Sequence, residues 1–427
     1  MDALILFLFL FFFISLSVPI GICLGLSTTL TLLLTSKIPT IIIAQNAFTG
    51  LDSFPLMAIP FFILAGNLME HGGISRRILT FADSLVGFIT GGLAMVTTLS
   101  CMIFAAISGS GPATVSAIGS FMIPAMKRRG YDDGFAAGLA AAAGSIGVII
   151  PPSIPFVIYA VATGTSISDL FIAGVIPGIL VGVALMIVSY IISKKNGWKG
   201  NEQKPSIKNV MVQFKESFWA LLMPVIVLGS IYTSISTPTE AAVIGIVYAV
   251  AVGKLVYKEL EWKFIYKAVV DAALINGATS FMIGLSSSFA SYLTMARVPS
   301  TVALLLTSAT DSPIAILLII NIFLLIVGCF IDNISSCLIL APIFLPIVVS
   351  YGISPVHFGL VMTLALAIGF VTPPYGANLF VATAISGVPF NKVARSAVPL
   401  VLAMIAVLLA VTYIEPLSMT LVRMVAK

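Results

Sequence analysis

The chain has 427 residues, of which 59% are hydrophobic and only 9% are charged, and its mean hydropathy is +1.16. Soluble domains carry charge on about a quarter of their residues, so this composition excludes an ordinary soluble protein and indicates a polytopic membrane protein. The net charge of +5 is typical of basic cytoplasmic loops, so it does not predict binding to nucleic acid.

The apolar runs are long enough for membrane helices of about 20 residues, and no alternating strands with hairpin turns are evident in the sequence. We therefore expect an all-α protein embedded in a lipid bilayer. The four cysteines lie within apolar runs and lack metal-ligand spacing, which indicates small buried side chains. They are Cys23, Cys101, Cys329 and Cys337.

In chain order, the first predicted elements are two short spans within residues 1–36 and a third span over about 54–69. Residues 72–88 predict a helix that lies in the membrane interface, with Arg76 and Arg77 on its polar side.

Residues 91–126 form an apolar segment that is interrupted by the helix-breaking turn Ile-Ser-Gly-Ser-Gly-Pro at 107–112. Basic residues flank the segment on both sides, so a single crossing would place one cluster on the wrong face of the membrane. This pattern predicts a re-entrant hairpin that enters from the cytoplasm and returns there. Its polar tip is tolerable at membrane depth only if it is buried in protein or lines a wet cavity.

A span over 132–163 follows and is broken at Pro151-Pro152-Ser153, and residues 170–193 return to the cytoplasm. The lysine-rich stretch 194–217 predicts a cytoplasmic linker. It separates a first half, residues 1–193, from a second half, residues 218–427.

In the second half, residues 218–235 and 238–253 predict a pair of spans, 254–267 a second basic interfacial helix, and 270–292 a further span. A second hairpin is expected over 313–349, with the polar tip Asp-Asn-Ile-Ser-Ser. The last elements are a span over 355–385, broken at Thr372-Pro373-Pro374, and a span over 397–415.

Glycines and prolines of the two halves match at a constant offset of 222 residues. The matching pairs are Pro124 and Pro346, Gly130 and Gly352, Gly147 and Gly369, Pro151 and Pro373, Pro152 and Pro374, and Pro177 and Pro399. Each half has an odd number of predicted crossings, so the two repeats must be inverted relative to each other. Inverted repeats with broken helices are typical of secondary transporters.

The sequence has no Gly-x4-Gly-Lys-Ser/Thr phosphate loop, which disfavours ATP hydrolysis and favours an ion gradient or the membrane potential as the energy source. The first hairpin tip offers the hydroxyls of Ser108 and Ser110 and the free ends of two half-helices. Carboxyl ends of helices favour cations and amino ends favour anions, which suits a sodium ion beside a carboxylate substrate. The alternative is a flexible kink whose small residues allow close helix packing.

Asp332 is the only acidic residue expected deep in the membrane. A carboxylate there is costly unless it is paired, so we favour a role in ion coordination. The alternative, which is compatible with it, is an N-cap for the following half-helix, where Asn333 and Ser335 also fit.

Each proline break leaves backbone carbonyls without a donor, and such carbonyls can coordinate a dehydrated sodium ion. We expect each break to face the hairpin tip of its own half, and Asn378 adds a side-chain amide to the second. The alternative is a simple proline kink.

The chain resembles a known family at these residues. Ser-Gly-Ser-Gly-Pro-Ala-Thr, Ile-Pro-Pro-Ser-Ile-Pro, Gly-Phe-Val-Thr-Pro-Pro-Tyr-Gly-Ala-Asn-Leu-Phe and the 222-residue repeat are similar to those of the large membrane subunit of TRAP (tripartite ATP-independent periplasmic) transporters. The resemblance covers essentially the whole chain. It implies a sodium-coupled importer of organic acids, not an enzyme, in the bacterial inner membrane. It also implies a small four-helix membrane subunit, a periplasmic substrate-binding protein as partners, and an elevator mechanism.

Carried over by position, the resemblance implies binding sites at the tips and breaks. The substrate carboxylate would contact Ser108 and Ser153, with Gly109 and Pro152. The first sodium site would comprise Ser108, Ser110, Gly111, Gly147 and Ile150. The second would comprise Asp332, Asn333, Ser335, Gly369, Thr372, Gly376 and Asn378.

Within the family, the overall likeness is closest to the sialic acid (N-acetylneuraminate) branch, and carriers of C4-dicarboxylates or other sugar acids are the alternatives. A different class also remains open, an ion channel or membrane scaffold whose hairpins form a filter. Two unlike half-sites argue against a filter, which is usually ring-like.

Overall fold

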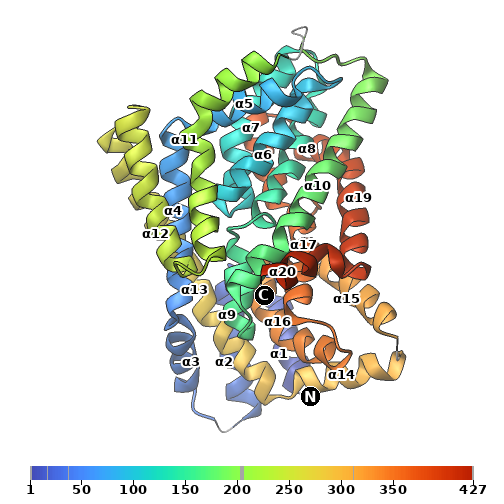
Figure 1. Cartoon of the computed structure of the whole chain (residues 1–427). Helices are drawn as coiled ribbons and strands as arrows, with labels where there is room; N and C mark the ends of the chain where they lie inside the picture. The colour runs from blue at the N-terminus through green and yellow to red at the C-terminus, as the bar shows by residue number, and fades with distance from the viewer. Residues whose placement is uncertain (1, 17, 37, 202–205, 311, 426–427) are drawn as a thin grey trace.

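The computed structural model of the chain describes residues 2–16, 18–36, 38–201, 206–310 and 312–425 (Figure 1). Within these ranges the ordered elements are all helices joined by loops, and none of the described residues forms a strand. The all-α prediction is confirmed.

The helices fall into two series. The first series is α1 (Asp2–Ser15), α2 (Ile20–Thr35), α3 (Ile41–Leu51), the 3-10 helix η1 (Phe54–Met57), α4 (Ala58–His71), α5 (Ile74–Val86), α6 (Gly92–Ser108), α7 (Gly111–Arg128), α8 (Asp133–Gly144), the 3-10 helix η2 (Ser145–Val148), α9 (Ile154–Thr163) and α10 (Ile167–Asn196).

The second series is α11 (Ile207–Tyr232), α12 (Pro238–Ala251), the π-helix η3 (Val252–Val256), α13 (Trp262–Met295), α14 (Val298–Ala309), α15 (Pro313–Gly328), α16 (Asn333–Ser350), α17 (Pro355–Gly369), α18 (Ala377–Ser386), α19 (Phe390–Tyr413) and α20 (Pro416–Val425).

The offset of 222 residues relates these two series. Shifted by 222, the bounds of α7 become 333–350, which are the bounds of α16. In the same way α5, α6, α8 and α9 fall on α14, α15, α17 and α18, with small differences at their ends. α10 falls on α19, which ends at Tyr413, before the shifted end of α10. The repeat seen in glycines and prolines is therefore a repeat of helices.

Both re-entrant hairpins are present. In the first, Leu93 at the start of α6 and Arg128 at the end of α7 line one and the same cavity. In the second, the Tyr351 hydroxyl after α16 donates to the Thr310 carbonyl before α15 at 3.2 Å. Each hairpin therefore returns to the end of the molecule from which it entered.

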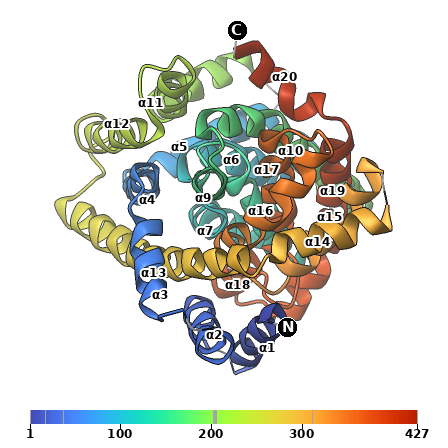
Figure 2. The ribbon, with the colours of Figure 1, turned by 90° about the horizontal axis from the view of Figure 1, so that it is seen from below.

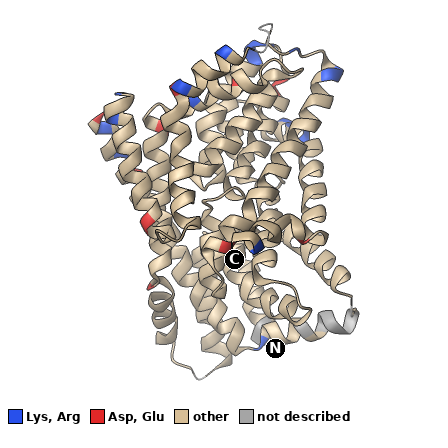
Figure 3. Cartoon of the chain, viewed as in Figure 1, with Lys and Arg blue, Asp and Glu red and all other residues tan. Residues whose placement is uncertain are grey.

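The two halves are inverted. Lysine and arginine residues gather at the end of the molecule that holds α5 and the start of α11 (Figure 3), whereas α14, the counterpart of α5, lies at the opposite end (Figure 1). The basic end is the one that the positive-inside rule assigns to the cytoplasm.

One predicted boundary is wrong. Residues 254–267 and 270–292 were expected as an interfacial helix and a separate span, but α13 runs without interruption from Trp262 to Met295. No proline or glycine separates the two stretches, so nothing in the local chemistry ends the helix there. The interfacial counterpart of α5 is instead α14, which the sequence reasoning missed.

Helices also extend into the stretch expected to be a linker. α10 continues to Asn196 and α11 begins at Ile207, so both ends of 194–217 are helical. Residues 202–205, near its middle, lie outside the described residues. The short helix α3, at 41–51, was not predicted.

Seven helices of the described chain are long and apolar enough to cross a membrane, judged by length and composition. They are Phe54–His71, Ile167–Asn196, Ile207–Tyr232, Pro238–Val256, Trp262–Met295, Asn333–Ser350 and Phe390–Tyr413. Asn333–Ser350 belongs to the second hairpin. The other predicted spans are short helices, α1 and α2, or the broken pairs α8–α9 and α17–α18.

Viewed along the molecule, the hairpin and broken helices α6, α7, α9, α16 and α17 lie in the centre, and α4, α11, α12 and α13 lie outside them (Figure 2). This arrangement places the two polar tips inside protein, as their unpaired backbone groups require.

Candidate functional site

The tip of the first hairpin is the turn between α6 and α7. α6 ends at Ser108, and Gly109 then adopts a φ of +62°, a left-handed conformation that glycine tolerates well. Ser110 is extended and caps α7, because its Oγ accepts a hydrogen bond from Ala113 N at 3.5 Å. The Ser-Gly-Ser-Gly-Pro sequence thus supplies the turn residue and the cap that two facing half-helices need.

The hydroxyls of this tip bind one another. Ser108 Oγ lies 2.8 Å from Thr114 Oγ1, and Thr114 Oγ1 donates to the Ser110 carbonyl at 2.8 Å. Ser108 and Thr114 are both buried. Thr114 is a tip residue that the sequence reasoning missed, although its position one turn after Ser110 could have indicated it.

The tip contacts the first proline break. Ile154 N donates to the Gly109 carbonyl at 3.2 Å, and a Cβ added at Gly109 would lie 2.9 Å from the Pro152 carbonyl oxygen. The structure therefore brings together Gly109 and Pro152, two residues of the predicted substrate site. A larger residue at Gly109 would push the tip away from the break.

Ser153 has its hydroxyl engaged within the break. Its Oγ donates to the Val148 carbonyl at 2.6 Å and accepts from Phe156 N at 3.4 Å, so it closes the break and caps α9. Ser153 is fully buried and is not among the residues that line the cavity next to Ser108. In this structure Ser108 and Ser153 do not share one cavity wall.

Gly147 of η2 lies directly against the tip. A Cβ there would clash with Thr114 Oγ1 and would lie 2.6 Å from the Ser110 carbonyl oxygen. Ile150, in contrast, directs its side chain toward Gly178 of α10, where an added Cβ would clash with it. Of the predicted first sodium site, Ser110 and Gly147 are thus in close contact, and the Ser110 carbonyl and the Thr114 hydroxyl face Gly147.

Gly111 and Asn378 connect the two halves. An added Cβ at Gly111 would lie 3.1 Å from Asn378 Oδ1, and Asn378 Nδ2 donates to the Ala141 carbonyl and to Ser145 Oγ, each at 3.0 Å. Asn378 Oδ1 is buried without a hydrogen-bond partner among the described residues. Asn378, predicted for the second sodium site, therefore contacts α8 and the tip of the first hairpin.

The second tip is built around Asp332. Its Oδ2 accepts from Ser335 N at 3.1 Å and so caps α16. The Ser335 hydroxyl lies 2.9 Å from Met282 Sδ of α13. This geometry matches the capping role that the sequence left open.

Two polar side chains beside Asp332 are buried without partners in the described part of the chain. Both amide atoms of Asn333 and the hydroxyl of Ser336 make no hydrogen bond there. Asn333 is 2% exposed and Ser336 is fully buried. Such groups are costly to bury unsatisfied, so their oxygens fit a cation that they could coordinate.

The second break also contacts its own tip. Gly328, at the end of α15, and Gly369 pack so closely that a Cβ at Gly369 would clash with the Gly328 carbonyl. Tyr375 N donates to the Cys329 carbonyl at 2.9 Å. The Thr372 hydroxyl donates back to the Ile368 carbonyl at 2.8 Å.

Gly376 ends the second break and precedes the first residue of α18, and it adopts a φ of +50°. Within the described residues no group of His, Cys, Asp and Glu could hold a metal ion. A cation at these tips would therefore meet mainly carbonyl, hydroxyl and amide oxygens, with the single carboxylate of Asp332 at the second tip, and such oxygens suit hard ions.

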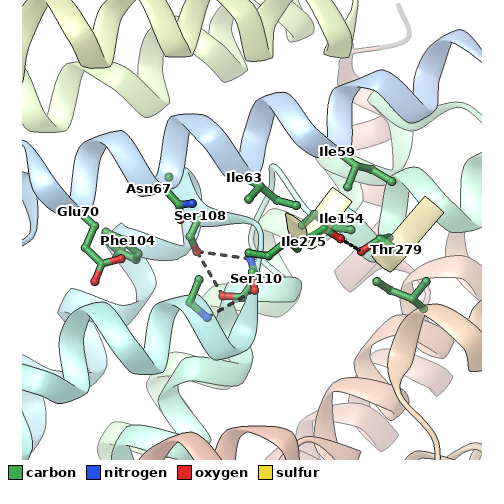
Figure 4. Close-up of a pocket in the computed structure, with 13 residues that line it drawn as sticks. Ile59, Ile63, Asn67, Glu70, Phe104, Ser108, Ser110, Ile154, Ile275 and Thr279 are labelled. Atoms are coloured by element: carbon green, nitrogen blue, oxygen red, sulfur yellow. Dashed lines mark hydrogen bonds between the residues drawn. The ribbon is translucent and has the colours of Figure 1, made fainter. Parts of the chain in front are cut away.

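A cavity of about 150 Å³ lies between the first hairpin tip and helices α4 and α13 (Figure 4). Ser108 and Ser110 line one side, and Ile334 of the second tip also reaches it. Asn67 and Glu70 of α4 line the opposite side. Both tips therefore border one cavity.

Sequence reasoning missed the wall that α4 contributes. The third span was expected to end near residue 69, which would leave Glu70 outside the membrane, yet Glu70 lines the same cavity as Ser108. Thr279 of α13 is a further polar lining residue. Glu70 and Thr279 are far from Ser108 in the sequence, and no local sequence pattern links either of them to the first tip.

The chain matches the family described as "Tripartite ATP-independent periplasmic transporter, DctM component" over residues 7–417. Among curated relatives, it is 48% identical to an isethionate TRAP transporter permease, DctMQ, from Oleidesulfovibrio alaskensis, over 91% of this chain and 61% of that protein. It is 42% identical to the C4-dicarboxylate large permease DctM of Pseudomonas aeruginosa, over 92% of this chain and 91% of the relative.

It is also 38% identical to the sialic acid large permease SiaM of Vibrio cholerae, over 91% of each chain. Among solved structures, the crystal structure of the YdaH transporter of Alcanivorax borkumensis shares the fold, with a TM-score of 0.59 over 87% of this chain and 86% of that one, at 15% identity. Taken with the helical hairpins and their tips, these matches show that the chain belongs to the DctM family, the large permease subunit of TRAP transporters, and is a multi-pass protein of the bacterial inner membrane rather than an enzyme.

Proposed function

We propose that this permease performs sodium-coupled uptake of an organic acid. The observation that carries the proposal is the meeting of the first hairpin tip with the first break, through Gly109 and Ile154, beside a cavity that Ser108 and Ser110 line. Broken helices that meet near the middle of a membrane protein are the usual substrate and ion sites of secondary transporters.

The first tip suits the substrate's anionic group. α7 begins at Gly111, directly after the cavity-lining Ser110. The amino end of a helix carries a partial positive charge and free N–H groups, which bind carboxylates and similar anions. The Ser108 hydroxyl, which bonds to Thr114 in this structure, would donate to the anion once it turns toward the cavity. Ser153 closes the break that contacts the tip.

The second tip suits a sodium ion. Asp332 supplies a negative charge, and the side-chain oxygens of Asn333 and Ser336 lack partners among the described residues. Leaving a buried polar group unsatisfied costs about 1–3 kcal/mol, which coordination of a cation would offset. We extend the same proposal to the Ser110 and Gly147 oxygens at the first tip.

We propose that the hairpins and broken helices move together as an elevator. Hydrogen bonds tie each tip to its own break, through Gly109 and Ile154 and through Cys329 and Tyr375. Asn378 ties the second broken helix to α8 of the first. These cross-connections favour motion as one body against the outer helices α4, α11, α12 and α13 (Figure 2).

The tripartite organisation of the family leads us to propose a small four-helix membrane subunit and a periplasmic substrate-binding protein as partners. The curated relatives are named for isethionate, C4-dicarboxylate and sialic acid transport. Sialic acid, the substrate favoured from the sequence, stays a prediction among these acids.

Reconstitution tests the proposal. The chain and its two partners are placed in liposomes, and uptake of labelled isethionate, succinate and sialic acid is followed under an imposed inward sodium gradient. We expect saturable uptake of at least one acid that stops when a sodium ionophore collapses the gradient. Equal uptake in sodium-free buffer under a proton gradient would contradict sodium coupling, and non-saturable current would indicate a channel.

A further inference from the structure

The cavity beside the first tip has two unlike walls. Ser108 and Ser110 lie on the hairpin wall, and Asn67 and Glu70 project from α4 on the facing wall (Figure 4). Apolar side chains, among them Ile63 and Phe104, line the space between. A ligand that places one end on the tip must therefore present its other end to α4.

The facing wall lies close to the tip. A Cβ added at Gly66 of α4 would lie 3.4 Å from Ser108 Cα. The next residue of α4 is Asn67, and its side chain lies next to Ser108 in Figure 4. A ligand bridging the two walls therefore has to be short.

The polar groups of α4 are available to a ligand. Neither the Asn67 amide nor the Glu70 carboxylate makes a side-chain hydrogen bond or ion pair in the part of the chain that the structure describes, and both side chains are half-buried. The Thr279 hydroxyl across the cavity is already bonded to the Ile275 carbonyl at 2.8 Å. Asn67 and Glu70 are thus the groups free to recognise the far end of a bound acid.

The charge of Glu70 decides which chemical group the ligand can present to α4. A carboxylate accepts hydrogen bonds from a hydroxyl or an ammonium group, whereas a second anionic group of the ligand would be repelled by it. Repulsion of this kind discriminates between ligands by penalising the wrong one. An acid with one anionic group on the tip and a hydroxyl at the other end satisfies both walls.

The volume sets the size. A cavity of about 150 Å³ accommodates a ligand the size of benzene, about six non-hydrogen atoms, and this partly open cavity measures about 150 Å³. Isethionate, a two-carbon sulfonate with a terminal hydroxyl, is close to that size. A sugar acid such as sialic acid is several times larger.

Resting on the proposed function, we propose that Asn67 and Glu70 of α4 select small acids that carry a single anionic group and a terminal hydroxyl, against dicarboxylates and sugar acids. The ligand's anionic group binds at the Ser108 tip, and its hydroxyl donates to Glu70 and contacts the Asn67 amide. Selectivity is then shared between the hairpin and an outer helix.

Direct binding tests this proposal without the selectivity of the periplasmic protein. The full chain, co-expressed with its small membrane subunit and purified in detergent, is titrated calorimetrically in sodium buffer with isethionate, succinate and sialic acid. We expect isethionate to bind at least tenfold more tightly than either of the others. Glu70→Gln should narrow the ratio of isethionate to succinate affinity at least tenfold, chiefly by improving succinate binding.

Two further variants keep the test decisive. Asn67→Asp adds a carboxylate to the same wall and should weaken succinate more than isethionate. Glu216→Gln removes an exposed carboxylate on α11, away from the cavity, and should leave the ratio unchanged.

Absence of sodium-dependent binding of every acid in the wild type would overturn the proposed function itself. If instead succinate or sialic acid binds as tightly as isethionate, the function stands and this inference is overturned. The same holds if Glu70→Gln and Asn67→Asp, both folded, leave the ratio of affinities at its wild-type value.

Discussion

The two hairpin tips occupy equivalent positions in the repeat, yet they satisfy their polar groups differently. At the first tip, the Ser108 and Thr114 hydroxyls and the Ser110 carbonyl bind one another. At the second tip, Asp332 caps α16, but the amide of Asn333 and the hydroxyl of Ser336 have no partner among the described residues.

This difference separates two kinds of site. The first tip is held by its own hydrogen bonds, so we expect its shape to persist without a bound ion. The second tip has buried polar groups without hydrogen-bond partners among the described residues. Each such group destabilises the fold by about 1–3 kcal/mol unless an ion or ligand binds to it. We therefore expect the second tip to respond most to sodium and the first to respond most to the substrate.

The two halves also differ in how closely each tip packs against its break, and this difference leads to the largest expected effect. The Cβ of an alanine at Gly369 would clash with three backbone atoms of Gly328, namely its carbonyl oxygen, carbonyl carbon and Cα. Backbone atoms cannot rotate away as a side chain can. Overpacking of this kind costs about 1–3 kcal/mol or more. Gly369→Ala should therefore lower the thermal unfolding temperature of the purified permease clearly and abolish uptake.

The equivalent Gly147→Ala in the first half should be less severe, because one of the atoms it meets, Thr114 Oγ1, belongs to a side chain. Gly277→Ala serves as the control, since a Cβ there would have no neighbour within 4 Å in the described part of the chain and should leave the protein as stable as the wild type. If Gly369→Ala behaved like Gly277→Ala, the second tip would not be packed as the structure has it.

Removing the charge of the second tip should uncouple transport from sodium. Asp332→Asn keeps the size and much of the capping ability of the side chain but offers a cation no charge. We expect sodium affinity, measured by calorimetry, to fall about tenfold to a hundredfold while the protein stays folded. Unchanged sodium affinity in this variant would leave Asp332 as a helix cap alone.

The serines of the first site should separate binding from stability. Ser108 lines the cavity, so Ser108→Ala should remove a charge-assisted hydrogen bond worth about 1.5–3 kcal/mol and weaken acid binding about tenfold to a hundredfold. Its effect on sodium affinity should be smaller than that of Asp332→Asn.

Ser153→Ala should mainly destabilise, by about 1 kcal/mol, because it loses the cap of α9 and the bond to Val148. Thermal unfolding and acid titration of both variants check this. A larger loss of acid affinity in Ser153→Ala than in Ser108→Ala would show that the substrate contacts Ser153 directly.

The smallest expected effect concerns the start of the two broken helices. Asp132 caps α8 by accepting from Phe135 N at 2.9 Å and pairs with Lys392 at 3.1 Å, both partly exposed. The equivalent residue, Ser354, precedes α17 without a side-chain cap bond. Asp132→Ala should cost about 1 kcal/mol of stability, and Ser354→Ala close to nothing. Equal unfolding temperatures for the two variants would contradict this asymmetry.

Much of the architecture is predictable from local patterns. The hairpins, the proline breaks and the inverted repeat all follow from where prolines and glycines interrupt long apolar runs, since these residues end helices wherever they occur. The bounds of α16 and α7 show how closely the repeat holds. Composition alone placed the chain in the membrane, where backbone groups must be satisfied within helices.

Local patterns failed where a neighbour distant in sequence decides the outcome. α13 stays continuous although its basic start favoured an interfacial helix, and its second half packs along α3 and the second hairpin. The Ser153 hydroxyl turns inward to Val148. Asn378 reaches across to Ala141 and Ser145 of the other half.

The sequence by itself determined the all-helical membrane class, the repeat and the position of each tip, because helix length, helix breaking and charge flanks act over a few residues. Only the tertiary structure decided which polar groups face one another. Glu70 and Asn67 line the same cavity as Ser108 because α4 packs closely against the first hairpin at Gly66. That contact depends on how two separate helices pack, and no local spacing encodes it.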